Sequence, residues 1–330
     1  METLEESELC FPQLLNTSCM KPQRSHFEAM LTYVLLFSIS LLTAFLNLLV
    51  VISISHFRQL HTPTNLLLLS LAVSDFFISF LMLFQIMLID GCWFLGDLLC
   101  ILYQYLAYVI TAVSVETMVL ISVDRYVAIC DPLRYPTRIT QKSVKICVCL
   151  CWICSVISPG LNLKDVLIQP GRYNSCFGEC VLVLNFISGV IEIIVFFFVP
   201  ITIIVLLYMR VFVVAVSQAR AMRSHIASVS LHHPSMKVTA KKSELKAACT
   251  LGVVVFIFLM CLCPYYCVAL TAQDNTMNAT STAFVICLYY FNSCINPMIY
   301  ALFYPWFRKS IKLIITLQIL QPDSCETNML

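Results

Sequence analysis

Asn292-Ser293-Cys294-Ile295-Asn296-Pro297-Met298-Ile299-Tyr300-Ala301-Leu302-Phe303-Tyr304-Pro305-Trp306-Phe307 is the stretch that decides the predicted fold. Its first twelve residues place two asparagines, a serine and a proline inside the last of seven apolar segments. Polar groups are costly inside a lipid bilayer, and those that persist there usually serve function. Apolar and cationic residues then alternate over 306–314, which predicts a short amphipathic helix at the membrane surface.

Composition places most of the chain in a membrane. Of the 330 residues, 60% are hydrophobic and 12% are charged, whereas a soluble domain is about half apolar and about a quarter charged. Seven segments are each long enough to cross a bilayer as a helix. We expect them near 30–55, 64–89, 98–123, 146–163, 181–209, 247–273 and 275–303. The predicted fold class is therefore an all-α membrane protein, a seven-helix transmembrane bundle with a short amphipathic eighth helix.

The same pattern divides the chain into three parts. We expect an N-terminal segment at 1–28, the bundle at 29–304, and the amphipathic helix with a tail at 305–330. The stretch 215–240 lacks apolar periodicity and predicts a mobile loop between two helices, and no regular structure is expected beyond residue 320.

Lysines and arginines predict the orientation. Alternate connections at 56–63, 124–145 and 210–246, together with the tail from 304, hold sixteen of the twenty cationic residues. Because short cytoplasmic loops are rich in Lys and Arg, these segments are expected inside and the N-terminus outside, as in a multi-pass plasma-membrane protein. The glycosylation sequons at Asn16 and Asn278 both fall on the predicted outer side.

Six of the eighteen cysteines also fall on the outer side: Cys10, Cys19, Cys92, Cys100, Cys176 and Cys180. An even number of cysteines in an oxidising compartment favours disulfides, although fifteen pairings of six are possible from the sequence alone. The other twelve are interpreted as small apolar packing residues, because their spacing and the lack of histidine partners do not fit a zinc site.

The asparagine-proline-tyrosine core at Asn296, Pro297 and Tyr300 resembles that of rhodopsin-like G-protein-coupled receptors. With Asn292-Ser293 before it and Tyr304, Trp306 and Phe307 after it, the pattern is similar to that of the trace amine-associated receptors. The resemblance covers about residues 10–320. It implies a receptor that binds a small amine outside and a heterotrimeric G protein inside, with expression in olfactory neurons and a stimulatory G protein.

Three residues that end the third span, Asp124-Arg125-Tyr126, resemble the cytoplasmic switch of this family. Glu244, twenty residues before Pro264, matches the family's partner acid, and the resemblance implies that it pairs with Arg125 at rest. An arginine that only snorkels to the cytoplasmic surface is the alternative.

Phe258 of the sixth span and Pro200 of the fifth match the family's transmission positions, and Pro264 is a further predicted switch residue on the sixth span. The usual Cys-Trp-x-Pro of this span is Cys261-Leu262-Cys263-Pro264 here, so Leu262 replaces the tryptophan.

A set of polar residues at mid-membrane matches the positions that hold a sodium ion in the family. Oxygen ligands around one carboxylate suit a small hard cation. A protonated Asp75 in a water-filled network is the alternative. The predicted sodium ligands are Asp75, Ser114, Asn292, Ser293 and Asn296.

The resemblance also implies a disulfide between Cys100 and Cys180. Because trace amine-associated receptors tie the N-terminus to the outer loops, we further expect Cys10 to pair with Cys176 and Cys19 with Cys92.

The predicted ligand site departs from the usual amine-receptor pattern. Eighteen residues before Arg125, where these receptors usually carry an aspartate, stands Ala107. Glu192, eight residues before Pro200, matches a position where a fish-rich branch of trace amine receptors carries an acid. No Lys or Arg lies in any span, and a carboxylate at this depth requires a cation or a proton. We therefore expect Glu192 to bind the ligand ammonium, with a protonated structural glutamic acid as the alternative.

Residues around this acid complete the predicted site. Thr111 lies on the same helix face as Ala107, and tyrosine rings suit contact with an ammonium. The expected ligand-binding set is Ala107, Tyr108, Thr111, Glu192, Tyr265, Tyr266 and Tyr290. Glu116 lies about half a turn around the helix from Ala107, so it is expected to face the fourth or fifth helix as a neutral, hydrogen-bonded group.

Other classes of protein fit less well. The sequence has no paired nucleophile and base and no phosphate-binding loop, so we expect neither an enzyme nor a cofactor beyond the possible sodium ion. A transporter would need internal pseudo-symmetry, and a retinal photoreceptor would need a lysine in the seventh span, which has none. Because Ala107 removes the usual amine partner, a receptor for a neutral or peptide ligand remains the alternative.

Overall fold

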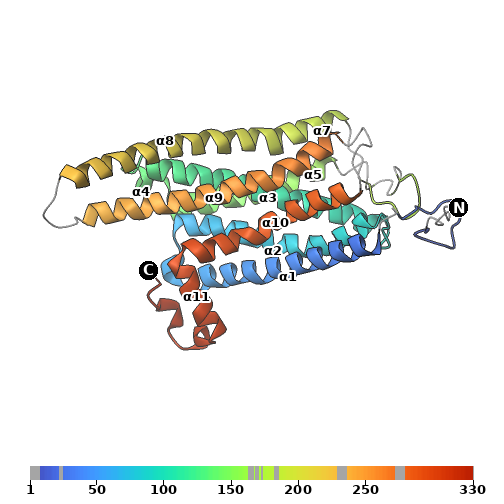
Figure 1. Ribbon diagram of the computed structural model, residues 1–330, viewed down its shortest axis with the longest axis horizontal. Helices are drawn as coiled ribbons and strands as arrows, with labels where there is room; N and C mark the ends of the chain where they lie inside the picture. The colour runs from blue at the N-terminus through green and yellow to red at the C-terminus, as the bar shows by residue number, and fades with distance from the viewer. Residues whose placement is uncertain are drawn as a thin grey trace.

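The structure is a computed structural model that describes residues 8–21, 25–162, 167, 171, 174–181, 186–228, 236–271 and 279–329. Long helices run side by side along its longest axis (Figure 1). They are α1 (His26–His56), α2 (Pro63–Ile89), α3 (Asp97–Cys130), α5 (Gln141–Asn162), α8 (Val199–Ser228), α9 (Met236–Thr271) and α10 (Ala279–Phe303). Shorter elements are η1 (Arg58–Leu60), α4 (Tyr135–Arg138), α7 (Phe186–Ile193), α11 (Pro305–Ile315), η4 (Gln318–Leu320) and η5 (Ser324–Glu326).

The predicted seven-helix bundle is confirmed. Six described helices are long and apolar enough to cross a membrane, and α9 contributes a shorter apolar stretch at Gly252–Val268. Local signals set several helix starts. Ser25 accepts a hydrogen bond from the backbone N–H of Glu28 at the start of α1. Thr62 caps α2 in the same way through Asn65, with Pro63 at the first helical position.

The fifth crossing consists of three consecutive helical pieces. α7 passes into a π-helical turn at Ile194–Phe198, labelled η2, and then into α8. Pro200 is the second residue after this turn and has no N–H to donate to the preceding carbonyls. A π turn adds one residue to the helical repeat, so side chains before and after it do not follow one continuous helical face.

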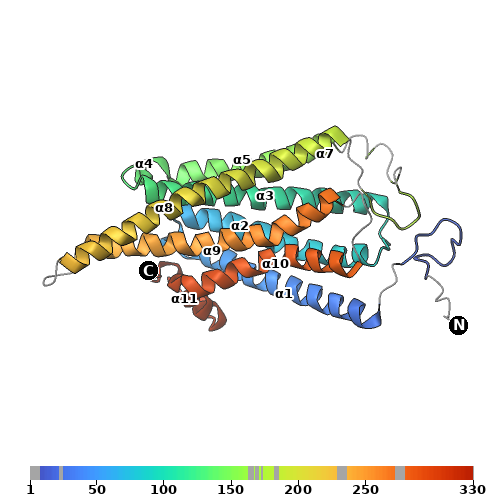
Figure 2. The same ribbon diagram turned by 45° about the horizontal axis from the view of Figure 1, so that its top comes forward.

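α3 lies at the centre of the bundle and packs against α2, α5, α8 and α9, while α1 packs against α2 and α10. Figure 2 shows the same arrangement after rotation, with the N-terminus and α11 at opposite ends. We call these the disulfide end, which carries Cys10–Cys92, and the Arg125 end.

Two predictions about connections are wrong. α8 continues to Ser228 and α9 begins at Met236, so most of the expected mobile loop at 215–240 is helical, and both helices project beyond the bundle (Figure 1). The stretch 215–228 contains four alanines and no Gly or Pro, which favours helix despite its polarity. The tail beyond 320 forms η5 and buries Met329, which is 2% exposed.

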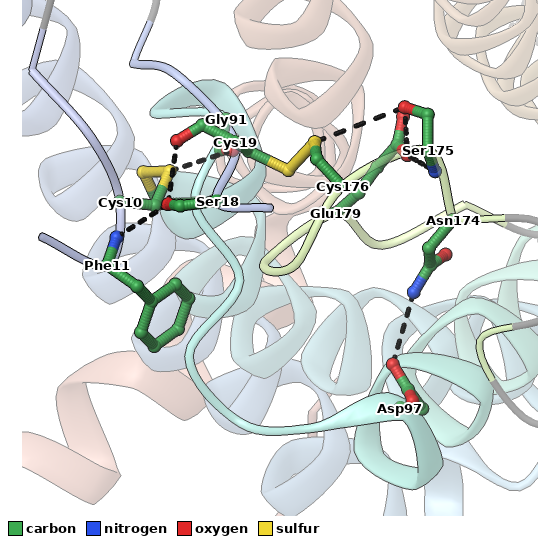
Figure 3. Close-up of a disulfide and its surroundings, with 11 residues drawn as sticks. Cys10, Phe11, Ser18, Cys19, Gly91, Asp97, Asn174, Ser175, Cys176 and Glu179 are labelled. Carbon is green, nitrogen blue, oxygen red and sulfur yellow. Dashed lines mark hydrogen bonds between the residues drawn. A yellow bond between two sulfur atoms is a disulfide. The ribbon is translucent and has the colours of Figure 1, made fainter. Parts of the chain in front are cut away.

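The described part of the disulfide end has three disulfides, and Figure 3 shows the Cys19–Cys176 bond and its surroundings. Cys100 pairs with Cys180, as expected. The other two expected pairings are wrong, because Cys10 bonds Cys92 and Cys19 bonds Cys176.

Backbone pairing explains this exchange. The N–H of Cys19 donates to the carbonyl of Phe177 at 3.1 Å, which aligns Cys19 with Cys176. Cys10 instead lies on the other side of the N-terminal segment, where its sulfur is 3.5 Å from the carbonyl oxygen of Gly91 beside Cys92.

Candidate functional site

A cavity of about 320 Å³ lies inside the bundle near the disulfide end, between α3, α7, α9 and α10. Six of the seven predicted ligand-binding residues line it: Ala107, Tyr108, Thr111, Glu192, Tyr265 and Tyr266. No lysine or arginine is among its described lining residues. A larger groove of about 530 Å³ lies between α8 and α9, but its lining has no charged residue.

Glu192 supplies the carboxyl group of the cavity. It stands on α7 two residues before the π-helical segment, and the residue is only 8% exposed. Tyr108 of α3 lies close enough to interact electrostatically with Glu192. The cavity is thus an aromatic chamber with one carboxyl group in its wall.

Stacked and tilted rings fix the shape of this chamber. Tyr266 stacks on Phe197 with ring centroids 4.0 Å apart, and Tyr265 lies 4.6 Å from Tyr289. Tyr108 meets Phe196 edge-on at 5.7 Å. Such contacts hold ring faces in place, and an ammonium bound among them would meet preformed π surfaces.

Tyr290 does not line the cavity, and the sequence reasoning missed Tyr289, which does. Tyr289 lines the cavity and its hydroxyl contacts Thr111 Oγ1 at 2.5 Å. Tyr290 instead points between α2 and α3, where its hydroxyl donates to Gln85 at 3.2 Å. Helical spacing could have found this, because Tyr289 lies three and seven residues before the inward-facing Asn292 and Asn296.

Glu116 faces away from the cavity, as expected. It lies against Cys151 and Ser155 of α5, the fourth crossing. These two glutamates of the bundle therefore have different surroundings. Glu192 borders a cavity, whereas Glu116 packs against a neighbouring helix.

Three of the five predicted sodium ligands, Asp75, Ser293 and Asn296, lie together inside the bundle, and Asn292 lies one turn before Asn296 on the same helix. Asn296 Nδ2 donates to Asp75 Oδ2 at 2.9 Å, and Ser293 also lies beside this carboxyl group. Ser114 donates to Ser74 at 2.9 Å. Within the described part of the chain, Asp75 Oδ1, Asn292 Oδ1 and Asn296 Oδ1 are buried and accept no hydrogen bond of standard geometry. The cluster therefore offers three oxygen acceptors to a further donor or cation.

At the Arg125 end, Asp124 is the centre of a polar network. Arg125 Nε donates to Asp124 Oδ2 at 3.0 Å, and the side chains are 8% and 2% exposed. Thr64 Oγ1 donates to the same oxygen at 3.0 Å and accepts from Arg125 Nη2 at 2.6 Å. Tyr135 of α4 donates to the other oxygen at 2.9 Å. Burial and the neighbouring Asp124 carboxylate raise the pKa of Tyr135, so this hydroxyl remains a donor at neutral pH.

The other predicted switch residues lie on the expected helices. Phe258 and Tyr300 are buried at 0% and 1% exposure, and Pro264 and Pro297 are inside α9 and α10. Leu262, which replaces the usual tryptophan, is also buried. Tyr126 follows Arg125 on α3 and packs against the small cluster of Ile129 and Val211.

Some predictions fall on residues that the structure does not describe. Glu244 is on α9, but its side chain is outside the described part, so its pairing with Arg125 stays a prediction. Asn278 is likewise outside the described residues. Asn16 is exposed in a turn at the disulfide end, which leaves its side chain accessible for glycosylation.

Comparison with known proteins relates this site to one family. Residues 46–300 match the sequence profile of the 7 transmembrane receptor (rhodopsin family). The chain is 36% identical to trace amine-associated receptor 13c of Danio rerio, covering 98% of this chain and 97% of the relative. It is 37% identical to trace amine-associated receptor 9 of Rattus norvegicus, with 98% and 97% covered. With trace amine-associated receptor 4 of Mus musculus it shares 34% identity, covering 98% and 96%.

Proposed function

Because this chain belongs to the rhodopsin family of seven-transmembrane receptors, and within it to the trace amine-associated receptors, we propose that it is a G-protein-coupled receptor for small amines. The observation that carries the ligand class is Glu192 in the wall of an aromatic cavity. An ammonium group would gain a carboxylate partner there and cation–π contact with the tyrosine faces.

The proposed orientation places the disulfide end outside the cell and the Arg125 end in the cytoplasm. Disulfides form in the compartments that lead to the cell surface, and all three lie at one end of the bundle. The lysines and arginines of α11 lie at the other end, as is usual for cytoplasmic segments. The receptor is then a multi-pass plasma-membrane protein whose cavity opens toward the outer solution.

A screen of small amines with a cAMP reporter tests this function. The receptor is expressed as wild type, as Glu192→Gln and as Glu116→Gln, with surface expression measured for each. We expect activating amines to lose roughly 2–5 kcal/mol of binding in Glu192→Gln, as when one partner of a buried charge pair is removed. Glu116→Gln is the matched control, because the same change is made on the face that packs against α5.

Unchanged amine potency in Glu192→Gln at normal surface expression would contradict the assignment. A neutral or peptide ligand is the second candidate, and Ala107 favours it because this position offers no charge to an amine. In that case no amine would activate the wild type, and potency of the true ligand would not depend on the charge of Glu192.

For the inner side, we propose that Arg125 and its partners hold the resting state and release a G-protein-binding surface on activation. Arg125 is buried within the Asp124 network, so moving it requires the network to break. The proposed G protein is stimulatory and the proposed cell is an olfactory neuron, in line with the resemblance to trace amine-associated receptors. A ligand-dependent rise in cAMP, rather than a fall, is the expected readout.

The Asp75 cluster fits a sodium ion. Three buried oxygens there accept no hydrogen bond of standard geometry among the described residues, and one belongs to a carboxyl group. Asp75, Asn292, Asn296, Ser293 and Ser114 would hold the ion, which would stabilise the resting state by binding it preferentially. Amine affinity should then fall as sodium replaces choline in the assay, and this dependence should disappear in Asp75→Asn.

A further inference from the structure

The tail that follows α11 folds back onto the first connection of the bundle, η1 (Figure 1). Ser324 Oγ is 3.0 Å from His56 Nε2, at the end of α1. Arg58 Nη1 is 3.1 Å from Glu326 Oε1. The N–H of Met329 donates to Gln59 Oε1 at 2.9 Å. Three residues within 56–59, at the end of α1 and in η1, thus each contact a different residue of the tail.

Met329 is the apolar anchor of this contact. Its side chain is 2% exposed and belongs to the same buried cluster as Phe57, Leu60 and Trp306. The Arg58–Glu326 pair is 72% and 65% exposed, so water screens it and it adds little. Burial of one methionine with a few hydrogen bonds is a small interaction, and such a contact can open without unfolding the bundle.

From η1, hydrogen bonds continue to the switch arginine. Asn65 Nδ2 donates to the carbonyl of Leu60 at 2.9 Å, which joins η1 to the first turn of α2. In that same turn, Thr64 accepts from Arg125 and donates to Asp124. The tail therefore supports the segment that supplies one of the two described hydrogen-bond acceptors of Arg125.

We propose that the tail, residues 318–329, is an intramolecular ligand of η1 and a brake on signalling. Docked, it holds η1 and the first turn of α2 in the position in which Thr64 binds Arg125. Released, it allows Thr64 to move and Arg125 to leave the Asp124 network. The brake rests on the proposed coupling to a G protein, but the docking itself does not.

The test compares Met329→Asp with two controls in the full-length receptor. Met329→Asp puts a charge into the buried anchor site, Met329→Leu keeps an apolar anchor, and Gln321→Asp adds the same charge at an exposed tail position. We expect Met329→Asp alone to raise ligand-free signalling by about threefold at equal surface expression, which is within the range of couplings across packed elements.

A double-mutant cycle with Thr64→Val separates the brake from other effects of the tail. Thr64→Val removes the hydroxyl that binds Arg125 and should itself raise ligand-free signalling. If the brake acts through Thr64, Met329→Asp adds nothing in that background. Fully additive increases would overturn the proposed route, and no increase from Met329→Asp, or an equal one from Gln321→Asp, would overturn the brake.

Hydrogen exchange on the purified receptor tests the docking without any signalling assay. The backbone N–H groups of Leu60, His61 and Leu66 are hydrogen-bonded to nearby backbone carbonyls. Met329→Asp should raise exchange over 58–62 and also over 64–66, where Thr64 lies. Exchange equal to wild type over 58–62 would overturn the docking, and a rise confined to 58–62 would overturn the link to Thr64. This result stands even if the receptor couples to no G protein.

Discussion

The buried carboxyl groups at the two ends of the bundle have different surroundings. At the Arg125 end, Asp124 accepts hydrogen bonds from Arg125, Thr64 and Tyr135, so three side chains of the same protein surround it. At the disulfide end, Glu192 forms part of the wall of a cavity of about 320 Å³. A network of mutual partners holds one conformation, whereas a carboxyl group beside a cavity is placed to interact with something that enters.

Breaking the inner network should have the largest effect. In Asp124→Asn, Arg125 keeps its charge but loses its buried counter-ion, which costs roughly 3–5 kcal/mol in the resting state. We expect strong ligand-free signalling, measured with a cAMP reporter at matched surface expression. Asp131→Asn is the matched control, because Asp131 also pairs with an arginine, at 3.6 Å, but that arginine is 67% exposed. Equal basal signalling in both variants would mean that the Asp124 network does not hold the resting state.

The predicted partner on α9 should have a smaller effect. Glu244→Ala removes the acid proposed to pair with Arg125 and should shift the population toward the signalling state by roughly 1–3 kcal/mol. The measurement is ligand-free signalling in three variants: Glu244→Ala, Asp124→Asn and the variant that carries both changes. Basal activity at the wild-type level in Glu244→Ala would argue that Asp124 and Thr64 restrain Arg125 without help from α9.

The cavity at the disulfide end can be tested by comparing ligands that carry one and two ammonium groups. Glu192 is the only carboxylate among the described residues that line the cavity, so a monoamine should be preferred over a diamine of equal length. A second ammonium left without a partner in a buried site is costly, and we expect a preference of about tenfold, or roughly 1.4 kcal/mol. A diamine that is tenfold more potent would reveal a second acid, and Glu179 of the loop before α7 is the first candidate to mutate.

The smallest expected effect distinguishes two neighbouring tyrosines. Tyr289→Phe removes the hydroxyl that contacts Thr111 in the cavity wall, and Tyr290→Phe removes one that binds Gln85 outside it. We expect Tyr289→Phe to weaken amine potency by roughly 0.5–1.5 kcal/mol, the net value of one hydrogen bond, and Tyr290→Phe to leave it unchanged. A larger loss in Tyr290→Phe would reverse the assignment.

Hydrophobicity made the seven helices predictable, because each crossing must be apolar over its full length. The α8 and α9 extensions were missed because polar residues outside a membrane can form a helix without apolar periodicity. Helix formers such as the alanines between 215 and 228 carried the better signal. The structured tail was missed for a related reason, since its burial depends on one residue, Met329, rather than on a repeating pattern.

Within the site, sequence reasoning found residues whose chemistry is unusual for their position. Glu192 and Asp75 are carboxylates in apolar spans, and both lie where they were expected. Sequence reasoning failed where two residues of the same type were candidates and only the positions of their side chains differed. Tyr289 and Tyr290 are adjacent tyrosines, which helical spacing relative to Asn292 and Asn296 distinguishes. Cys92 and Cys176 are both loop cysteines at the disulfide end, and backbone pairing decides between them.

The three disulfides join the segments at the disulfide end into one closed covalent ring. The N-terminal segment is bonded to the connection after α2 through Cys10 and to the loop before α7 through Cys19. That loop is bonded in turn to the start of α3 through Cys180. The N-terminal segment is thus attached at two points, and a single cut of the peptide backbone between 10 and 19 would leave both pieces bonded to the bundle. With both disulfides intact, the segment cannot move away from the loops as a unit. Reduction of Cys10–Cys92 or of Cys19–Cys176 alone would therefore leave the N-terminal segment attached through the other disulfide.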